Sequence, residues 1–243
     1  MGAGMKKKVL ITGASRGIGE ATARLLAKEG YDLFLVCRNS EEEIKRIKLE
    51  LEESYPISCE IALCDVSDPV QVETMIEQAG EIHVLIHNAA ISYAGLLTDM
   101  TLEQWHHVID TNLNALFYTS RLVIPQMVRR REGKIINVSS VWGNAGASME
   151  VAYSASKGGV NSFTKALAKE LAPSGIQVNG VAFGVIDTSM NACFSKEELE
   201  TLREEIPADR LGNVKEAAEM IRQIIQSPSY LTGQIITMDG GWT

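Results

Sequence analysis

Short apolar runs alternate with longer amphipathic segments along the whole chain. The apolar runs are nearly continuous in Val, Ile and Leu, which is typical of parallel strands covered on both faces. They occupy residues 7–13, 32–38, 58–65, 83–89, 133–140, 176–184 and 234–241. The segments between them predict helices over residues 17–29, 40–54, 69–79, 101–130, 153–172 and 214–226. This alternation predicts an α/β fold, with a doubly wound parallel sheet and helices on both of its faces.

Local signals support several of these boundaries. Asp68 followed by Pro69 is typical of a helix start, with an N-cap and a proline at the first helical position. Pro173 and Gly175 end the helix that begins near residue 153. Residues 185–212 have no clear role in covering the sheet, and an insertion beyond a strand's carboxyl end often contacts substrate. We therefore predict a single domain over residues 1–243 with a substrate lid at 185–212.

The composition argues against several classes of function. The net charge is −8 and the pI is near 5.1, whereas general nucleic-acid binding needs a basic face. No apolar run approaches the roughly 18 to 20 residues of a membrane span, and the run after the N-terminal lysines is too short for a signal peptide. We therefore expect a cytoplasmic protein. Its cysteines lack metal-site spacing and are expected to be reduced: Cys37, Cys59, Cys64 and Cys193.

A glycine-rich turn follows the first predicted strand, in "ITGASRGIGEATARLLAKEG". Gly13, Gly17 and Gly19 allow a tight turn and let backbone N–H groups approach a phosphate at the positive end of the next helix. Their spacing differs from the G-x-G-x-x-G of the general dinucleotide fingerprint. Between a strand and a helix they predict a nucleotide site, with a purely structural turn as the alternative.

The residues after the second strand bear on the choice of cofactor. Sites that select NAD place a carboxylate there to accept hydrogen bonds from the ribose. Cys37 and Arg38 stand there instead, and a guanidinium can bind a 2′-phosphate through charge-assisted hydrogen bonds. Arg16 in the glycine turn is a second cation within plausible reach. We therefore predict NADPH/NADP+, with an Arg38 that merely covers apolar surface as the alternative.

The ends of the third and fourth strands supply further candidates. Asp65 could accept a hydrogen bond from the adenine amino group, with Val66 against the ring, or it could simply cap a turn. Asn88 could fix backbone geometry or touch the ribose. The histidines suit strand or helix positions better than ligand positions, so no metal site is predicted.

Ser140, Tyr153 and Lys157 lie on either side of a loop of small residues in "SSVWGNAGASMEVAYSASK". Tyr153 and Lys157 are one helical turn apart and therefore share a helix face. Ser140 ends a predicted buried strand. If the loop over residues 141–152 folds back, the three polar groups meet at one point.

Together these motifs resemble the short-chain dehydrogenase/reductase family over essentially the whole chain. The shared marks are "TGASRGIG", "HNAA", Asn112 in "DTNLNALF", Ser140 and "YSASK", while "TGQIITMDGGW" is similar to the 3-oxoacyl-[acyl-carrier-protein] reductases of that family. The resemblance implies a Rossmann-type sheet of seven parallel strands and usually a homotetramer. It also implies a set of cofactor contacts: Gly13, Ser15, Arg16, Gly17, Ile18, Gly19, Arg38, Asn39, Asp65, Val66, Asn88, Ala89, Ala90, Tyr153, Lys157, Gly184, Ile186 and Thr188.

Two positions depart from the family pattern. The family often has Asn-Asn-Ala-Gly where this chain has the run from His87 to Ala90, and it usually has proline where Phe183 stands. Both changes bear on loop geometry and substrate fit beside the expected nicotinamide. Neither removes a group that could transfer a proton.

Ketone reduction needs a hydride on carbon and a proton on oxygen, so beside a hydride-donating cofactor the protein must supply the proton. Free tyrosine has a pKa of about 10, and we expect the ammonium of Lys157 to favour tyrosinate and lower that pKa. Tyr153 would then be the general acid, and Ser140 would stabilise charge on the substrate oxygen. The resemblance implies that Asn112 holds a water that relays protons to Lys157.

The predicted substrate is a 3-oxoacyl thioester on an acidic acyl carrier protein, as in fatty acid synthesis. Trp142, Met190 and Phe194 are candidate substrate contacts. The basic cluster Arg129–Arg131 with Lys134 could meet the carrier, although its simpler interpretation is a solvated helix end. The run around Trp142 also resembles reductases thought to complete an aminoketone lysine modification on elongation factor P. A small ketone or steroid is another alternative, and a non-catalytic NADP-sensing protein is an alternative of a different class.

Overall fold

A single sheet of seven parallel strands forms the centre of the protein, whose computed structural model describes residues 6–190 and 195–243. The strand order is β3-β2-β1-β4-β5-β6-β7. Every strand lies within its predicted range, and the Rossmann-type sheet that the resemblance implied is confirmed. The strands are β1 (Lys8–Thr12), β2 (Asp32–Cys37), β3 (Cys59–Leu63), β4 (Val84–His87), β5 (Gly133–Ser140), β6 (Ile176–Phe183) and β7 (Ile235–Met238).

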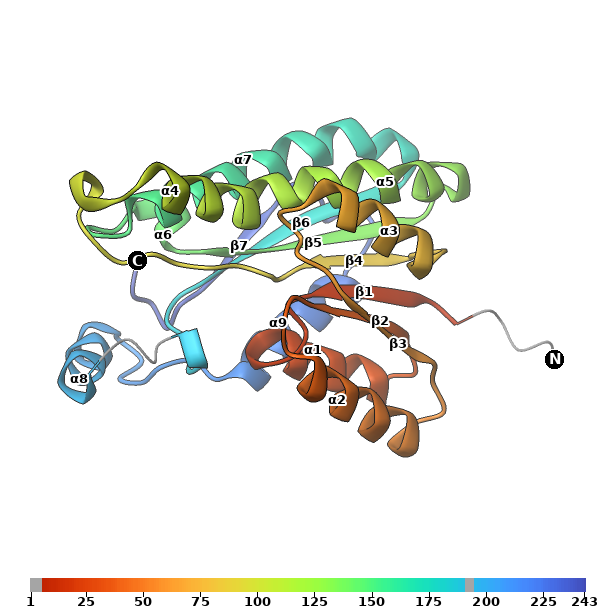
Figure 1. Cartoon of the computed structure of the whole chain (residues 1–243), viewed down its shortest axis with the longest axis horizontal. Helices are drawn as coiled ribbons and strands as arrows, with labels where there is room; N and C mark the ends of the chain where they lie inside the picture. The colour runs from red at the N-terminus through yellow and green to blue at the C-terminus, as the bar shows by residue number, and fades with distance from the viewer. Residues whose placement is uncertain (1–5, 191–194) are drawn as a thin grey trace.

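Helices cover both faces of the sheet, as predicted. Figure 1 shows α3, α4, α5 and α7 over one face and α1, α2 and α9 over the other. The Asp68 carboxylate accepts hydrogen bonds from the N–H groups of Val70 and Gln71, which confirms the predicted start of α3. These helices are α1 (Gly17–Lys28), α2 (Glu41–Ser54), α3 (Pro69–Ala79), α4 (Leu102–Ile109), α5 (Ala115–Arg130), α7 (Val151–Leu171) and α9 (Val214–Gln226).

Side chains of each central strand alternate between two buried apolar clusters. In β1, Val9 and Ile11 belong to the cluster that includes Ile47 of α2, while Leu10 belongs to the cluster that includes Val123 of α5. Because both faces are buried, most positions of the strands are apolar. Among the described residues, no helix has the length and apolar composition that crossing a bilayer requires.

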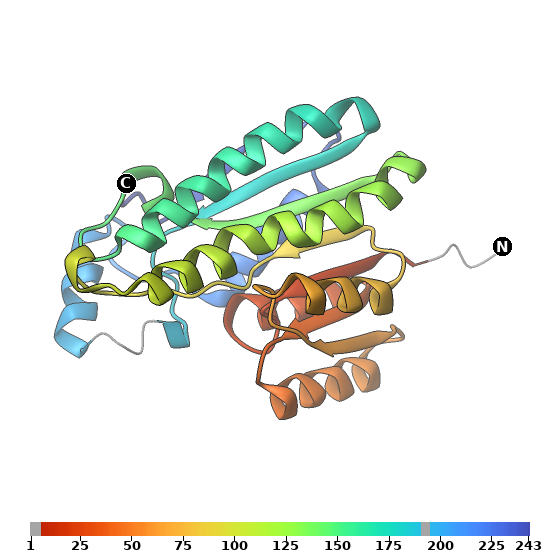
Figure 2. The same ribbon diagram turned by 45° about the horizontal axis from the view of Figure 1, so that its top comes forward.

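The described residues also form several elements that hydrophobic periodicity did not predict. The expected helix over 101–130 is interrupted between α4 and α5 by a π-helical turn at Asp110–Asn114. A short helix, α6 (Trp142–Ala145), lies in the loop before α7, and α8 (Lys196–Glu205) lies within the expected lid. Figure 2 shows α8 and the C-terminus at the same end of the molecule. Periodicity missed the π turn because the helix continues on both sides of it.

The two ends of the segment 185–212 are hydrogen-bonded to each other. The N–H of Asp187 donates to the Gly212 carbonyl over 2.8 Å, and the N–H of Gly212 donates to the Val185 carbonyl over 3.0 Å. Ile186 and Gly212 thereby form an isolated parallel bridge. The ends of the segment are joined, and α8 extends away from the sheet (Figure 1).

Candidate active site

Candidate residues from distant parts of the chain meet at the carboxyl edge of the sheet. Ser140 at the end of β5 pairs in register with Phe183 of β6, which pairs with Met238 of β7. The glycine turn follows β1, other predicted cofactor positions follow β2, β3, β4 and β6, and Tyr153 and Lys157 lie on α7. In parallel sheets of this kind, ligands bind at this edge.

Ser140, Tyr153 and Lys157 are brought together, and all three are buried. Ser140 lies close enough to the Tyr153 phenol to act on its pKa. Lys157 Nζ lies 5.6 Å from the centroid of the Tyr153 ring and donates to the Val138 carbonyl over 2.8 Å. The N–H of Trp142 donates to Ser140 Oγ over 3.2 Å, so α6 is the turn that folds the loop back.

Burial controls the protonation of this group. It raises the pKa of Tyr153 to about 12, with Ser140 acting in the opposite direction and the charge of Glu150 adding to the rise. Burial also lowers the pKa of Lys157 to about 8. The pKa of Tyr153 was expected to be lowered by Lys157 and is instead raised, because removal from water outweighs the lowering influence of Ser140. The phenol is protonated at neutral pH and can donate that proton.

Asn112 lies in the π turn, and both the oxygen and the nitrogen of its side-chain amide make hydrogen bonds. Its Oδ1 accepts from the N–H of Ile91, and its Nδ2 donates to the Ile91 carbonyl, each over 2.8 Å. The same Nδ2 donates to Ser156 Oγ over 3.0 Å, and that hydroxyl donates to the Tyr153 carbonyl over 2.7 Å. Asn112 thus ties the loop after β4 to the helix that carries Tyr153. Its contact with a relay water stays a prediction.

The glycine turn is packed too closely for other side chains. A Cβ on Gly19 would lie 2.3 Å from the Gly13 carbonyl oxygen and 2.6 Å from Asn88 Nδ2. Gly13 and Gly17 have φ values of 67° and 59°, in the left-handed region. Asn88 Nδ2 donates to the carbonyls of Thr12 and Gly13, over 3.0 and 2.9 Å. Of the two alternatives for Asn88, the structure supports the fixing of backbone geometry.

Arg38 and Asp65, predicted at the adenosine end, lie beside each other. Arg38 Nη1 is 3.6 Å from Asp65 Oδ2 and 3.4 Å from His107 Nε2. Although burial acts to raise the pKa of Asp65, hydrogen bonds from Ser67 and the Arg38 charge lower it overall. The Arg38 side chain is still 45% exposed, and the Arg16 side chain is exposed with no hydrogen bond or ion pair to another described residue. Both cations are accessible to an anion.

The segment after β6 approaches the glycine turn. A Cβ on Gly17 would lie 3.5 Å from Thr188 Cγ2. Phe183 is buried in the core, so this departure from the family pattern does not line the substrate space. Ala90 lies outside the left-handed region, so alanine introduces no backbone strain there. The other predicted cofactor positions follow the ends of their strands: Ser15, Ile18, Asn39, Val66, Ala89, Gly184 and Ile186.

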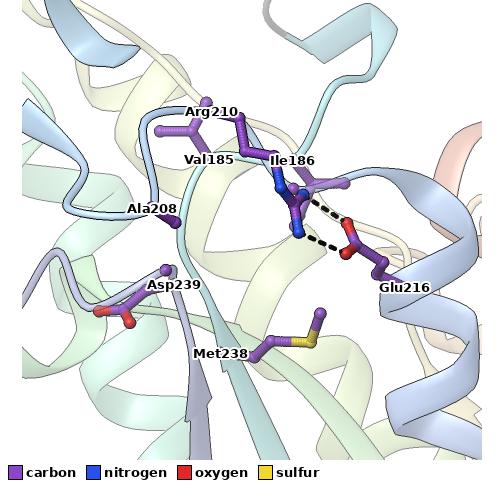
Figure 3. Close-up of a pocket in the computed structure, with 9 residues that line it drawn as sticks. Val185, Ile186, Ala208, Arg210, Glu216, Met238 and Asp239 are labelled. Carbon is purple, nitrogen blue, oxygen red and sulfur yellow. Dashed lines mark hydrogen bonds and ion pairs between the residues drawn. The ribbon is translucent and has the colours of Figure 1, made fainter. Parts of the chain in front are cut away.

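Figure 3 shows a small pocket at the base of the segment 185–212. Arg210 donates two hydrogen bonds to the Glu216 carboxylate, over 2.8 and 2.7 Å, which joins the end of the segment to α9. With a volume of about 60 Å³ and neither Ser140 nor Tyr153 in its lining, this pocket is not the substrate site. Met190 is 47% exposed, and Phe194 lies outside the described residues.

The site also contains two residues that the sequence analysis did not predict. The indole of Trp242 packs edge-on against Trp142, with ring centroids 4.8 Å apart. Glu150 accepts a hydrogen bond from Ser92 Oγ over 2.5 Å, and its negative charge raises the pKa of Tyr153. The "GGWT" ending was one available signal, but only folding could show which residue it would contact.

The buried His87 and the cysteines play a structural part. His87 lies between Asn137 and Thr119, and its burial lowers its pKa to about 4, so it is neutral. In the described ranges, no three potential ligands are grouped closely enough to hold a metal ion. Cys37, Cys59 and Cys64 are free and buried. The fourth cysteine, Cys193, lies outside the described residues.

Comparisons with known proteins agree with this geometry. Residues 7–199 match the family model of the short chain dehydrogenases. The chain is 37% identical to the uncharacterized oxidoreductase YmfI of Bacillus subtilis (strain 168), over 98% of this chain and 99% of the relative. It is 38% identical to the 3-oxoacyl-[acyl-carrier-protein] reductase FabG of Staphylococcus aureus (strain Mu50 / ATCC 700699), over 98% of both chains. Its identity to the FabG of Thermotoga maritima is 39%, over 97% of both chains.

The chain therefore belongs to the short-chain dehydrogenase/reductase family, and it is an oxidoreductase. Enzymes of this family use a nicotinamide cofactor. The relatives align over nearly their full length, so the likeness covers the sheet, the glycine turn and the Ser140, Tyr153 and Lys157 group together.

The buried Lys157 gives a testable dependence of stability on pH. Its pKa is about 8 when folded against 10.5 for the ordinary group, so between these values the unfolded chain binds more protons and stability rises with pH. The unfolding free energy of the wild type should therefore rise by about 2 kcal/mol relative to Lys157→Met between pH 7.5 and 10. Urea unfolding measures this, with the exposed Lys165→Met as control. A wild-type-to-Lys157→Met difference that is constant with pH would contradict the burial argument.

Proposed function

We propose that the protein is a cytoplasmic, NADPH-dependent carbonyl reductase whose main substrate is a 3-oxoacyl thioester on an acyl carrier protein. The observation that carries this proposal is the buried group of Ser140, Tyr153 and Lys157, in which Lys157 Nζ lies 5.6 Å from the centroid of the Tyr153 ring. It places a protonated phenol at the carboxyl edge of the sheet, beside a glycine turn suited to a dinucleotide. A phenol in this position can protonate the oxygen of a ketone as it is reduced.

The residues present fit a phosphorylated dinucleotide. The glycine turn leaves no room for a Cβ at Gly19 and exposes backbone at the start of α1, where the helix dipole favours a phosphate. Arg16 and Arg38 are exposed cations at the end where a 2′-phosphate would lie. When bound, this cofactor supplies the hydride.

Each polar residue has a distinct part in moving the proton. Tyr153 donates its phenolic proton to the ketone oxygen, and Ser140 hydrogen-bonds that oxygen and stabilises its developing charge. The tyrosinate left behind lies next to Lys157. Because the pKa of Lys157 is about 8, its amine is mostly protonated at pH 7 and can stabilise the tyrosinate. Asn112 holds the two segments in position through Ile91 and Ser156.

Replacing Tyr153 by Phe tests the proton donor. We expect Tyr153→Phe to fold and bind cofactor but to lose roughly 10²- to 10⁴-fold in kcat/KM, the usual scale for a positioned general acid. Tyr118→Phe on α5 is the matched control and should keep its activity. NADPH consumption can be followed by absorbance, and near-normal turnover by Tyr153→Phe would remove this residue from the mechanism.

Arg38 should determine cofactor preference. A charge-assisted hydrogen bond contributes about 1.5–3 kcal/mol, and about 1.4 kcal/mol is tenfold, so NADPH should be preferred over NADH by at least about tenfold in kcat/KM. Arg38→Asp should erode or reverse the preference, whereas Arg46→Asp on α2 should leave it unchanged. Equal use of the two cofactors by the wild type would refute the assignment.

Exposed apolar side chains on the segments that follow the carboxyl ends of β4, β5 and β6 support a carrier-borne substrate. They come from the loop after β4, the start of α4, the turn before α7 and the segment after β6: Leu96, Leu97, Leu102, Met149 and Met190. Exposed apolar patches commonly mark contacts with other macromolecules. The relatives from Staphylococcus aureus and Thermotoga maritima carry the name of a carrier-protein reductase.

The basic cluster Arg129–Arg131 with Lys134 does not serve that contact. It lies where α5 ends and β5 begins, whereas Ser140 is at the other end of the eight-residue strand β5. At about 3.3 Å per residue, the two are separated by about 25 Å. We therefore do not assign the docking of a carrier to this cluster.

A second candidate substrate is a protein-borne aminoketone, as in the modification of elongation factor P. The Trp142–Trp242 pair offers aromatic surface to an ammonium group, since cations bind favourably over indole faces. Glu150 adds a carboxylate without an ion pair to any described residue. These two features favour a cationic substrate more than a thioester.

A side-by-side substrate panel separates these candidates. The enzyme is given NADPH with acetoacetyl-carrier protein, elongation factor P bearing the aminoketone, and small ketones including a steroid. We expect the thioester to have the highest kcat/KM, by at least about tenfold over a simple diketone. A higher rate with the aminoketone would overturn the carrier-protein assignment, and binding of NADPH with no turnover of any candidate would indicate an NADP-sensing protein.

We also propose that the protein is a homotetramer, in keeping with its family resemblance. Phe117 on the outer face of α5 is 51% exposed, so apolar surface is available for contact between subunits. Light scattering at micromolar concentration should give about four times the mass of one chain. A monomer under these conditions would contradict the proposal, and Phe117→Glu tests whether this face takes part.

A further inference from the structure

The amino-terminal edge of the sheet contains a second cavity, with a volume of about 360 Å³. It is lined by residues at or just before the starts of β1, β4, β5 and β6 and by the end of α9. This volume is within the range of small-molecule sites. The cavity and Ser140 lie at opposite ends of β5, about 25 Å apart at ordinary strand rise. It is therefore separate from the proposed active site.

Positive charge is in excess in this cavity. Lys7, Arg131 and Lys134 line it together with a single carboxylate, that of Glu132, which pairs with Lys7. Lys134 is partly buried, and its Nζ donates only to the Ser227 carbonyl, over 3.0 Å, with no acidic partner among the described residues. Burial, and then the charge of Lys7, lower the pKa of Lys134, while the charge of Glu132 acts in the opposite direction. A partly buried ammonium group without an ion pair is unusual, and an anion would stabilise it.

Two further donors face the same space. Arg131 has a φ of 54°, in the left-handed region, and its Nη2 donates to the Pro173 carbonyl over 3.3 Å. Non-glycine residues adopt this conformation at a cost, often near ligand sites. His83 Nδ1 accepts from the N–H of Lys8 over 3.2 Å, so the proton of the neutral ring is on Nε2, which can donate. Burial, and then the charge of Arg130, lower the pKa of His83 and keep it neutral.

Part of the lining is apolar. Tyr31, Val84 and Ile225 contribute to the cavity wall. With His83 neutral, the three cations and one carboxylate leave a net charge of +2. This charge complements the roughly −2 of a phosphate monoester at neutral pH. We propose that this cavity is a binding site for a small organic phosphate whose apolar body rests against Tyr31. The proposal goes beyond the reductase reaction and does not depend on it.

Calorimetric titration of the full-length protein with phenyl phosphate tests this site. The protein is first saturated with its nicotinamide cofactor, so that phosphate-binding groups at the glycine turn are already occupied. We expect saturable binding of one ligand per chain with a dissociation constant below about 1 mM. Phenol, which has the same ring without the charge, should not bind measurably.

Two variants and one control locate the binding. Lys134→Met and Arg131→Gln should each weaken phenyl phosphate binding by about tenfold or more. Arg129→Gln removes an exposed cation of the same basic cluster that does not line the cavity, and should bind as the wild type does. Unchanged cofactor affinity shows that each variant is folded. The His83 ring signal in a proton NMR spectrum should shift on titration, while that of the buried His87 should not.

Three results would overturn the proposal. The first is no saturable binding up to about 10 mM phenyl phosphate, far above the expected dissociation constant. The second is wild-type affinity in both folded variants, which would place the ligand elsewhere. The third is equal affinity for phenyl phosphate and inorganic phosphate, which would show that the apolar wall contributes nothing. None of these outcomes depends on the reductase activity, so they are separate from any failure of the proposed function.

Discussion

The parallel pairing of β1 with β4 is the constraint on which the candidate site depends. It brings together the glycine turn and the loop after β4, which are about 75 residues apart in the chain. Thr12 Oγ1 accepts hydrogen bonds from the N–H groups of Asn88 and Ala89, each over 3.1 Å, and Asn88 in turn holds the carbonyls of Thr12 and Gly13. Because these hydrogen bonds run in both directions, each loop fixes the backbone conformation of the other. The same loop is tied to the helix of Tyr153 by Asn112, so the cofactor end and the proton-donating end form one connected unit.

Burial of polar groups then determines the chemistry. Free in water, Tyr153 and Lys157 would resemble ordinary surface residues, but each is almost fully enclosed, and burial favours the neutral form of both. The enclosure is tolerated because neighbouring polar groups are paired: Ser139 Oγ donates to Asn161 Oδ1 over 2.6 Å, and Asn161 Nδ2 donates to Asn144 Oδ1 over 2.9 Å. A site held in this way needs little rearrangement when charge develops on a substrate oxygen.

The two edges of the sheet differ in their chemistry. At the carboxyl edge are the protonated phenol, the paired indoles of Trp142 and Trp242, and an apolar rim. At the amino edge, residues that precede the strands gather Lys7, Arg131 and Lys134 around a cavity. The basic cluster lies before and at the start of β5 in the chain, so the parallel sheet places it at the amino edge, opposite the candidate active site. The direction of this strand separates the basic cluster from the substrate.

Strand runs, helix lengths, the glycine turn and the spacing of Tyr153 and Lys157 could all be predicted from the sequence, because each is a local pattern with a period or a turn of its own. From these the parallel sheet and its functional edge follow. The π turn that carries Asn112, the helix α6 that brings Trp142 to Ser140, and the packing of Trp242 on Trp142 could not be predicted, since each depends on contacts between distant segments. The pKa of Tyr153 was predicted in the wrong direction for the same reason. The sequence determined that a cation would lie one turn away from the phenol, but only the tertiary structure decided that water would be excluded from both.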